Sequence, residues 1–231
     1  DYGTALKHAQ DLGFAESDPK FDVEGYDALY KLVILTMHSL GAYVNPDSVL
    51  NYGISHIGLA DIRYAKEKGL KFKLIGQVLK LDEERFTLFV LPRLVKPEEY
   101  IYNVEYEYNG VVIEGECYDK QFMFGKGAGA YPTGSAVLSD ITARMHDYRY
   151  EYKKNRYFRP LSYSDNVKLE IYLRYHDLVD FSLFDFEEIS EKYSGRDTNY
   201  VVGTIRLSNL IKIRPVLSKL DIFLAVTGKI E

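Results

Sequence analysis

The sequence predicts an α+β protein in which a mixed, largely antiparallel sheet is covered by helices and followed by a small α+β module. Three observations predict this class. Apolar residues first recur at helical spacing, then alternate as they do in strands, and a second strand and helix pattern begins after a connection rich in Tyr and Arg. The chain has 231 residues, of which 46% are hydrophobic and 27% charged, which is the balance of a folded protein.

The first part of the chain is predicted to be helical. The periodicity indicates helices over 4–11, 24–40 and 55–68, with Ser55 as an N-cap and Gly69 placed to end the third helix. One narrow face of the second helix is apolar and is expected to face the core; it carries Leu29, Leu32, Val33, Thr36, Met37 and Leu40.

The period then changes to that of strands. We predict strands over 70–81, 85–95 and 121–125, and a hairpin over 103–116 with its two-residue turn at Asn109 and Gly110. A glycine-rich turn then leads into a helix that begins at Pro132 or Thr133 and ends at His146.

A connection over 148–166 separates this part from a smaller unit. The smaller unit reads as a strand over 167–177, a helix over 184–195, a strand over 199–207, a helix over 208–220 that Pro215 disturbs, and a strand over 222–228. This order is βαβαβ-like. We therefore divide the chain into a domain over 1–150 and a linker with a C-terminal module over 151–231.

Composition excludes several classes of function. A net charge of −5 with scattered basic residues argues against nucleic acid as a partner, and no apolar run is long enough to span a membrane. The single cysteine, Cys117, cannot form an internal disulfide, and the five histidines show no metal-binding spacing. We expect a cytoplasmic protein without a metal site. The chain starts at Asp1 without an initiator Met, and the stretch YGTALKHAQDLG that follows already reads as a helix, so we expect it to be a piece of a longer protein.

Residues 13–31, GFAESDPKFDVEGYDALYK, concentrate carboxylates ahead of one lysine. Asp27 and Lys31 lie one helical turn apart, on a side that also carries Ile34 and Leu35, so we expect this side to be partly buried. A half-buried lysine beside a carboxylate suits a general acid. The alternative is a surface ion pair worth about 0.3 to 0.5 kcal/mol, and spacing alone favours that alternative.

Two further interpretations concern a calcium-binding loop in this stretch and the glycine-rich turn later in the chain. A calcium-binding loop starting at Asp18 is excluded, because Val23 stands where glycine is required and Leu29 where a bidentate glutamate should stand. The glycines at 125, 127 and 129 precede a helix, so their backbone N–H groups can face an anionic or polar ligand, or they can form only a tight strand-to-helix turn.

Two stretches together resemble the homoserine dehydrogenase family. LGFAESDPKFDVEGYDALYKLVIL resembles a family signature that leads from a Gly-aromatic-Ala/Thr-Glu opening to a helix lysine. GKGAGAYPTGSAVLSDI resembles the family's later glycine-rich segment, in the same order along the chain. The resemblance covers about 2–147. It implies an oxidoreductase that interconverts L-aspartate 4-semialdehyde and L-homoserine with NADP or NAD, on the route to threonine, methionine and isoleucine.

The resemblance also implies a role for individual residues of this sequence. Lys31 matches the lysine that gives the carbonyl oxygen its proton, Glu16 and Asp27 match positions that bind the substrate amine, and Asp22 matches a supporting acidic position. The glycines Gly13, Gly127 and Gly129 match places where the backbone lies close to the cofactor. Asp18 and Glu24 are interpreted as structural.

Other expectations concern two domains known in the family, of which one is absent from this sequence and the other differs from the usual pattern. The family binds its nucleotide mainly with an N-terminal Rossmann domain, so we expect this piece alone to be inactive. LEIYLRYHD resembles the first strand of a ferredoxin-like, ACT-type regulatory module, although one strand is missing from the predicted pattern. We also expect a homodimer. The alternative function is a non-enzymatic amino-acid-binding regulatory or dimerisation module.

Overall fold

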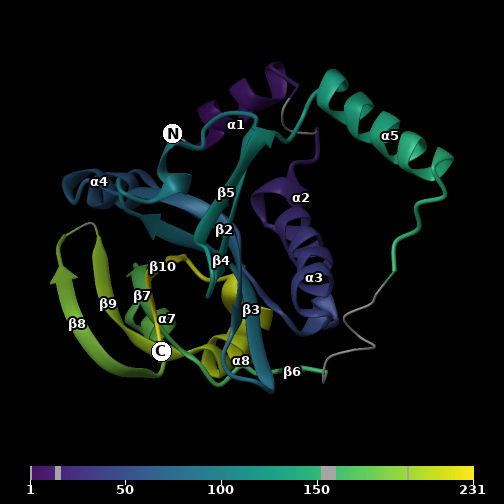
Figure 1. The fold of residues 1–231 in the computed structure, drawn as a ribbon. Helices are drawn as coiled ribbons and strands as arrows, with labels where there is room; N and C mark the ends of the chain where they lie inside the picture. The colour runs from purple at the N-terminus through teal and green to yellow at the C-terminus, as the bar shows by residue number, and fades with distance from the viewer. Residues whose placement is uncertain (1, 14–16, 152–159, 197) are drawn as a thin grey trace. The chain divides into compact units, whose positions relative to one another are not determined.

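A computed structural model describes residues 2–13, 17–151, 160–196 and 198–231 of the chain (Figure 1). The chain divides into two compact units, and each is described by itself. The first unit consists of Asp1–Tyr2, Pro19–Val95 and Tyr152–Glu231, and the second of Gly3–Asp18 and Lys96–Glu151. The division between 150 and 151 made from the sequence stays a prediction.

The helices and strands of the first unit confirm most of the sequence pattern. Its helices are α2 (Lys20–Val23), α3 (Tyr26–Leu40), α4 (Leu59–Glu67), α7 (Leu178–Phe181) and α8 (Leu207–Leu217). Its strands are β1 (Leu50–Asn51), β2 (Lys71–Lys80), β3 (Arg85–Val95), β6 (Ser162–Tyr163), β7 (Lys168–Tyr175), β8 (Phe186–Ser194), β9 (Asn199–Arg206) and β10 (Ile222–Ile230).

All of these strands belong to one mixed sheet. Its main path runs β1-β3-β10-β7-β9-β8, and β2 and β6 also pair with β3. The pairs β2–β3, β10–β7, β7–β9 and β8–β9 are antiparallel, whereas β1, β6 and β10 run parallel to β3. The predicted mixed, largely antiparallel sheet with covering helices is therefore confirmed.

Strand β3 is buried on both faces and separates two cores. Phe86, Leu88 and Val90 contribute to a cluster with Leu29, Leu32 and Val33 of α3, which lies along β2 and β3 (Figure 1). The alternate side chains Phe89 and Leu91 contribute to the larger cluster, which includes the buried residues of β7, β9, β10 and α8. Successive side chains of a strand point to opposite faces. Because both faces of β3 are buried, its sequence reads as a continuous apolar run.

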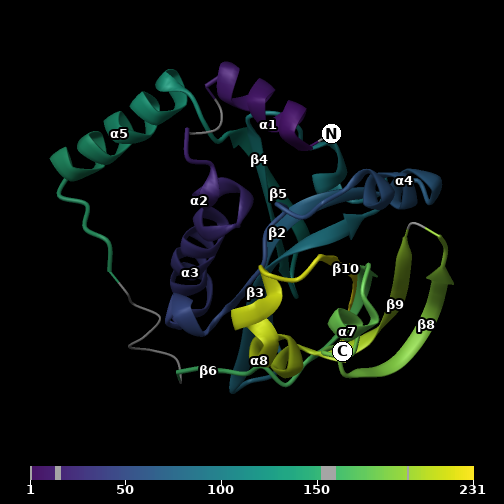
Figure 2. The same cartoon turned by 180° about the vertical axis from the view of Figure 1, so that it is seen from behind.

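The C-terminal strands and helices follow the order β7-α7-β8-β9-α8-β10, which is the βαββαβ order of ferredoxin-like units. The βαβαβ-like prediction was wrong because the segment 184–195, predicted as a helix, contains strand β8. The strand that was missing from the predicted pattern is this one. Figure 2 shows β8 beyond β9 at one edge of the sheet.

Pairing with β9 decides the conformation of β8. The sequence FEEISEKYS is rich in residues of good helix propensity, and a single-sequence pattern therefore favours a helix. In the fold it hydrogen-bonds to β9 from Phe186 to Ser194, and most of its side chains are exposed. Charged side chains on an edge strand also discourage pairing with another chain.

The second unit contains most of α1 (Tyr2–Asp11), α5 (Ala130–Met145) and a two-stranded sheet of β4 (Tyr108–Gly115) and β5 (Asp119–Lys126). The predicted turn at Asn109 and Gly110 was wrong: both residues lie inside β4, and the chain reverses between Gly115 and Asp119. A Cβ atom at Gly110 would come within 2.8 Å of the Phe122 ring, so close packing accounts for this glycine.

Smaller differences from the predicted boundaries have local causes. Helix α4 begins at Leu59 rather than near Ser55, and the Asp61 carboxylate accepts the N–H of Gly58 at 2.7 Å to cap it. Gly69, at φ 70°, follows α4 as predicted. Pro215 lies inside α8, which still extends to Leu217. Among the described residues, no helix has the length and apolar character needed to cross a membrane.

Gly53 lies against the short connection between α2 and α3, which we call the α2–α3 corner. The chain comes so close to this corner that there is no room for a side chain at position 53. A Cβ atom at this position would overlap the Val23 carbonyl and the Glu24 backbone. We predict that Gly53→Ala lowers the free energy of unfolding by about 1–3 kcal/mol through overpacking, measured by denaturant titration. Gly125→Ala, where a Cβ would meet nothing within 4 Å, is the control. Equal stabilities of the two variants would contradict this close approach.

Candidate functional site

The corner between α2 and α3 fixes the start of the helix that carries the predicted site. Gly25 is the N-cap residue of α3 and adopts φ 81°, a left-handed conformation that favours glycine. It is buried, and a Cβ there would lie 2.8 Å from Oδ1 of Asn51 and 3.1 Å from Cγ1 of Val90. The backbone of the corner is therefore packed directly on strands β1 and β3.

Two hydrogen bonds, one from the end of β1 and one from the segment after it, hold the corner in place. The Asn51 side-chain amide donates to the Glu24 carbonyl at 2.8 Å, and the Ile54 N–H donates to the Val23 carbonyl at 2.7 Å. Both carbonyls lie just before Gly25, so they restrain the direction in which α3 starts.

Asp27 and Lys31 form the predicted pair one turn apart on α3. Their charged atoms are 2.7 Å apart, but the side chains are 50% and 57% exposed. Ile34 and Leu35 are also exposed, at 57% and 40%. The expectation that this side is partly buried was wrong for the described part of the chain, where the core contacts of α3 come from the opposite face. That core face itself was predicted, since Leu29, Leu32, Val33 and Thr36 are buried.

Of the two other acidic residues predicted for the site, the structure describes one. Asp22 lies on the short helix α2 and is exposed. Glu16 lies outside the residues that the structure describes, so the expectation that Glu16 and Asp27 bind the same substrate amine stays a prediction.

In the second unit, the glycine turn connects β5 to α5. Gly127 donates its N–H to the Glu107 carbonyl at 2.8 Å, and a Cβ on it would overlap the Asn109 side chain. Gly129 is the N-cap residue of α5, with φ 118°. A hollow beside this turn has mostly small and apolar walls; it is lined by Glu107, Lys126, Ala128, Gly129, Ala130, Tyr131, Pro132 and Ser135.

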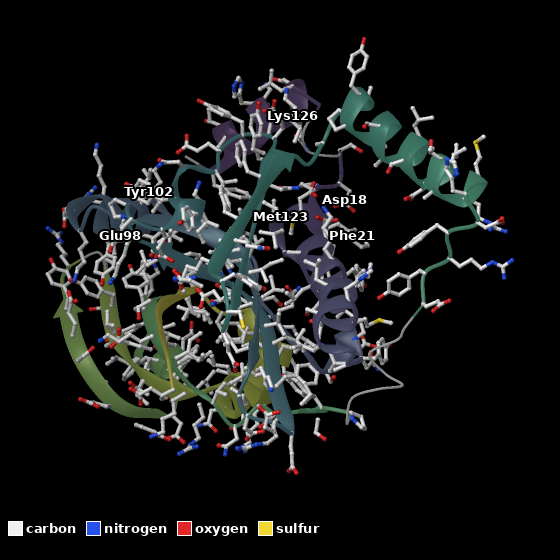
Figure 3. All side chains as sticks on the ribbon, in the orientation of Figure 1. Asp18, Phe21, Glu98, Tyr102, Met123 and Lys126 are labelled. Atoms are coloured by element: carbon white, nitrogen blue, oxygen red, sulfur yellow. The ribbon has the colours of Figure 1, made fainter. Side chains whose placement is uncertain are left out.

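Two of the residues that line this hollow form an ion pair. Lys126 is the last residue of β5, and Figure 3 labels it together with Met123 of the same strand. Its ammonium lies 2.8 Å from the Glu107 carboxylate. This hydrogen bond lowers the pKa of Glu107 and raises the pKa of Lys126, so both side chains stay charged over the neutral range. Gly13, at φ 74°, follows α1 in the same unit.

A polar hollow on the C-terminal strands is lined by Lys168, Glu170, Glu188, Ser190, Thr204, Lys229 and Glu231. Within the described ranges, no group of His, Cys, Asp and Glu side chains has the arrangement of a metal site. Cys117 is a free, exposed thiol.

The first unit is an α+β domain in which helix α3, with its Asp27–Lys31 ion pair, lies on a mixed sheet. The second unit contains a glycine turn that opens a long helix. The profile of the family described as homoserine dehydrogenase matches residues 1–142. The chain therefore belongs to the homoserine dehydrogenase family.

Curated relatives agree with this membership. The chain is 35% identical over 205 residues to a homoserine dehydrogenase of Bacillus subtilis, covering 86% of this chain and 46% of that protein. It is 40% identical over 136 residues to one of Pseudomonas aeruginosa, covering 59% of this chain and 31% of that protein.

Solved structures extend the similarity to the C-terminal part. A homoserine dehydrogenase from Thiobacillus denitrificans superposes with a TM-score of 0.74 and 28% identity, covering all of this chain and 57% of that one. A hyperthermophilic archaeal homoserine dehydrogenase mutant in complex with NADPH gives a TM-score of 0.52 and 28% identity, covering 64% of this chain and 41% of that one. The chain thus spans about half the length of the Bacillus subtilis and Thiobacillus denitrificans proteins.

The sequence pattern missed the residues that support the α2–α3 corner. Asn51 ends a strand of only two residues and Gly53 follows it, and neither belongs to a recognisable motif. Gly25 carried a weak signal, since a glycine near the start of the helix predicted over 24–40 indicates a backbone requirement.

Proposed function

We propose that this chain is the substrate-binding and dimerisation part of a homoserine dehydrogenase, which interconverts L-aspartate 4-semialdehyde and L-homoserine with NADP or NAD. The observation that carries the proposal is the family match over 1–142, which includes both the acidic helix segment and the glycine turn. The Asp27–Lys31 ion pair on a well-anchored helix supports it.

Family membership favours the enzyme over a non-enzymatic regulatory module. A module that only senses an amino acid has no need for a proton donor, whereas reduction of an aldehyde requires one at the carbonyl oxygen. We also propose that the ferredoxin-like C-terminal module is ACT-like and acts in packing or subunit contact. A cytoplasmic location and a place in threonine, methionine and isoleucine biosynthesis follow from the proposed reaction.

The proposed substrate explains why carboxylates and a lysine are needed together. It carries an α-ammonium, an α-carboxylate and a reactive aldehyde. We assign Asp27 and Glu16 to the ammonium, Asp22 to ordering these charges, and Lys31 to the carbonyl oxygen. Lys31 would donate a proton to this oxygen when the aldehyde is reduced, and would accept it back when the alcohol is oxidised.

The cofactor would be held mainly by a nucleotide-binding domain outside this chain. When bound, NADPH or NADH supplies the hydride for the carbonyl carbon. The turn before α5 fits one end of such a group, because Gly127 and Gly129 bring backbone close to the surface and the adjoining hollow has small and apolar walls. We assign Gly13, Gly127 and Gly129 to this contact.

Replacing Lys31 tests the proton donor directly. In the full-length enzyme, we predict that Lys31→Ala lowers kcat by about 10² to 10⁴-fold with a smaller change in KM, because a general acid acts mainly in the transition state. Steady-state kinetics in both directions measure this. Lys66→Ala, an exposed lysine on α4, should leave both constants unchanged. Near-normal turnover of Lys31→Ala would overturn the assigned role.

Replacing Asp27 should have a different kinetic signature. Because the proposed contact to the substrate amine is present in the ground state and the transition state, Asp27→Ala is expected to raise the KM for homoserine, with a smaller loss in kcat. Asp18→Ala, a nearby carboxylate assigned to the turn, is the control. The assignment fails if Asp18→Ala harms catalysis more than Asp27→Ala in an equally stable protein.

Assembly can be tested on the full-length enzyme. The ribbon of β4 and β5 is two-stranded, and Ile113 and Met123 on one of its faces are 37% and 52% exposed. Such a ribbon is marginal by itself, so we predict that a second copy of the chain covers it. Light scattering at tens of micromolar should give the mass of a dimer. A monomer at this concentration would contradict the prediction.

A further inference from the structure

A buried polar cluster joins the C-terminal module to the segment that supports the α2–α3 corner. Asp61 of α4 is fully buried, and Arg174 of β7 is 6% exposed. The Arg174 Nε donates to both carboxylate oxygens of Asp61 at 3.0 Å. The Tyr172 hydroxyl donates to the same carboxylate at 2.9 Å, and the Gly58 N–H at 2.7 Å. Every oxygen of this carboxylate is therefore hydrogen-bonded.

Stability alone is a weak reason for such a cluster. Removing two charges from water costs several kcal/mol per ion, and an apolar pair of similar volume is often as stable. Burial accordingly raises the pKa of Asp61, while the Arg174 guanidinium opposes that rise. What an apolar pair cannot supply is a directed hydrogen bond to a third group.

Arg174 makes one such bond. Its Nη2 donates to the backbone carbonyl of His56 at 2.8 Å. His56 lies in the segment 53–58, between the Ile54 N–H that holds the Val23 carbonyl and the Gly58 N–H that Asp61 accepts. The Arg174 guanidinium therefore holds this segment in two ways. It donates directly to the His56 carbonyl, and it binds the Asp61 carboxylate, which accepts the Gly58 N–H.

The same segment restrains the start of α3. Ile54 holds the Val23 carbonyl, and Gly53 packs against the backbone of Val23 and Glu24. Gly25 follows directly and begins the helix on which Asp27 and Lys31 stand. All these residues belong to the first compact unit. A displacement of 53–58 would therefore move or loosen the α2–α3 corner.

We propose that Arg174 is a positioning residue, which holds the segment 53–58 so that the α2–α3 corner presents Asp27 and Lys31 in one orientation. The C-terminal module then supports the substrate-binding helix as well as packing against the sheet. This inference rests on the proposed function for its kinetic consequence, whereas its mechanical part concerns the fold alone.

Two substitutions in the full-length enzyme separate positioning from stability. Arg174→Gln removes the charge and can fail to fold, because it leaves the Asp61 carboxylate unpaired. Arg174→Lys keeps a positive charge beside Asp61, but one ammonium cannot reproduce the forked contact to both Asp61 and the His56 carbonyl. For Arg174→Lys we expect the KM for homoserine to rise by about tenfold or more, with the KM for the cofactor unchanged.

Leu173→Ala is the matched control. Leu173 is the neighbouring residue of the same strand, is fully buried, and faces the opposite side of the sheet. Its truncation should lower the melting temperature at least as much as Arg174→Lys while leaving both KM values unchanged, since loss of folded enzyme alone does not change KM.

Amide hydrogen exchange supplies a readout that does not depend on catalysis. The Ile54 N–H and the Leu29 N–H, which donates to the Gly25 carbonyl, should exchange faster in Arg174→Lys than in Leu173→Ala at matched global stability. Unchanged exchange at these amides, or an unchanged KM for homoserine, would overturn the positioning role. If Lys31→Ala kept its turnover, the role assigned to Lys31 would fail, and the exchange result would still decide whether Arg174 holds the corner.

Discussion

Burial of β3 on both faces is the constraint on which the rest of the first unit depends. This strand pairs with β1, β2, β6 and β10, and its alternate side chains enter two different cores. One face requires α3 as a cover, and the other requires the C-terminal strands with α8. A segment more than 70 residues later in the sequence therefore completes the core that begins at β3.

The position of α3 on this strand explains the character of the candidate site. Leu29, Leu32 and Val33 bury one side of the helix, and Gly76 of β2 allows Leu32 to approach within 3.3 Å of where a Cβ would stand. Only the opposite side is left for charged groups, and it carries Asp27 and Lys31. The helix is thus rigidly seated while its charged side remains open, which suits a side chain that must meet a substrate.

A buried ion pair connects the C-terminal strands to the helix that carries the proposed chemistry. Burying Asp61 and Arg174 is costly, yet the pair restrains a segment whose hydrogen bonds reach the α2–α3 corner. A sheet shared by both parts makes this support possible, because β7 lies in the same sheet as β3 with only β10 between them. The C-terminal strands therefore contribute to the geometry of segments that precede them in the sequence of the same compact unit.

The sequence by itself determined the elements whose pattern is strong and local, together with the family. Helix α3, strands β2, β3, β7, β9 and β10, and the Asp27–Lys31 pair follow from periodicity and spacing, and two ordered motifs carried the resemblance that the comparisons bear out. Tertiary structure alone decided several other features. Residues 186–194 are a strand because β9 supplies hydrogen-bond partners that outweigh helix propensity, and Gly110 serves ring packing rather than a turn. Arg174 and Asp61 are 113 residues apart, and no local pattern can show that two distant charges will share one buried site.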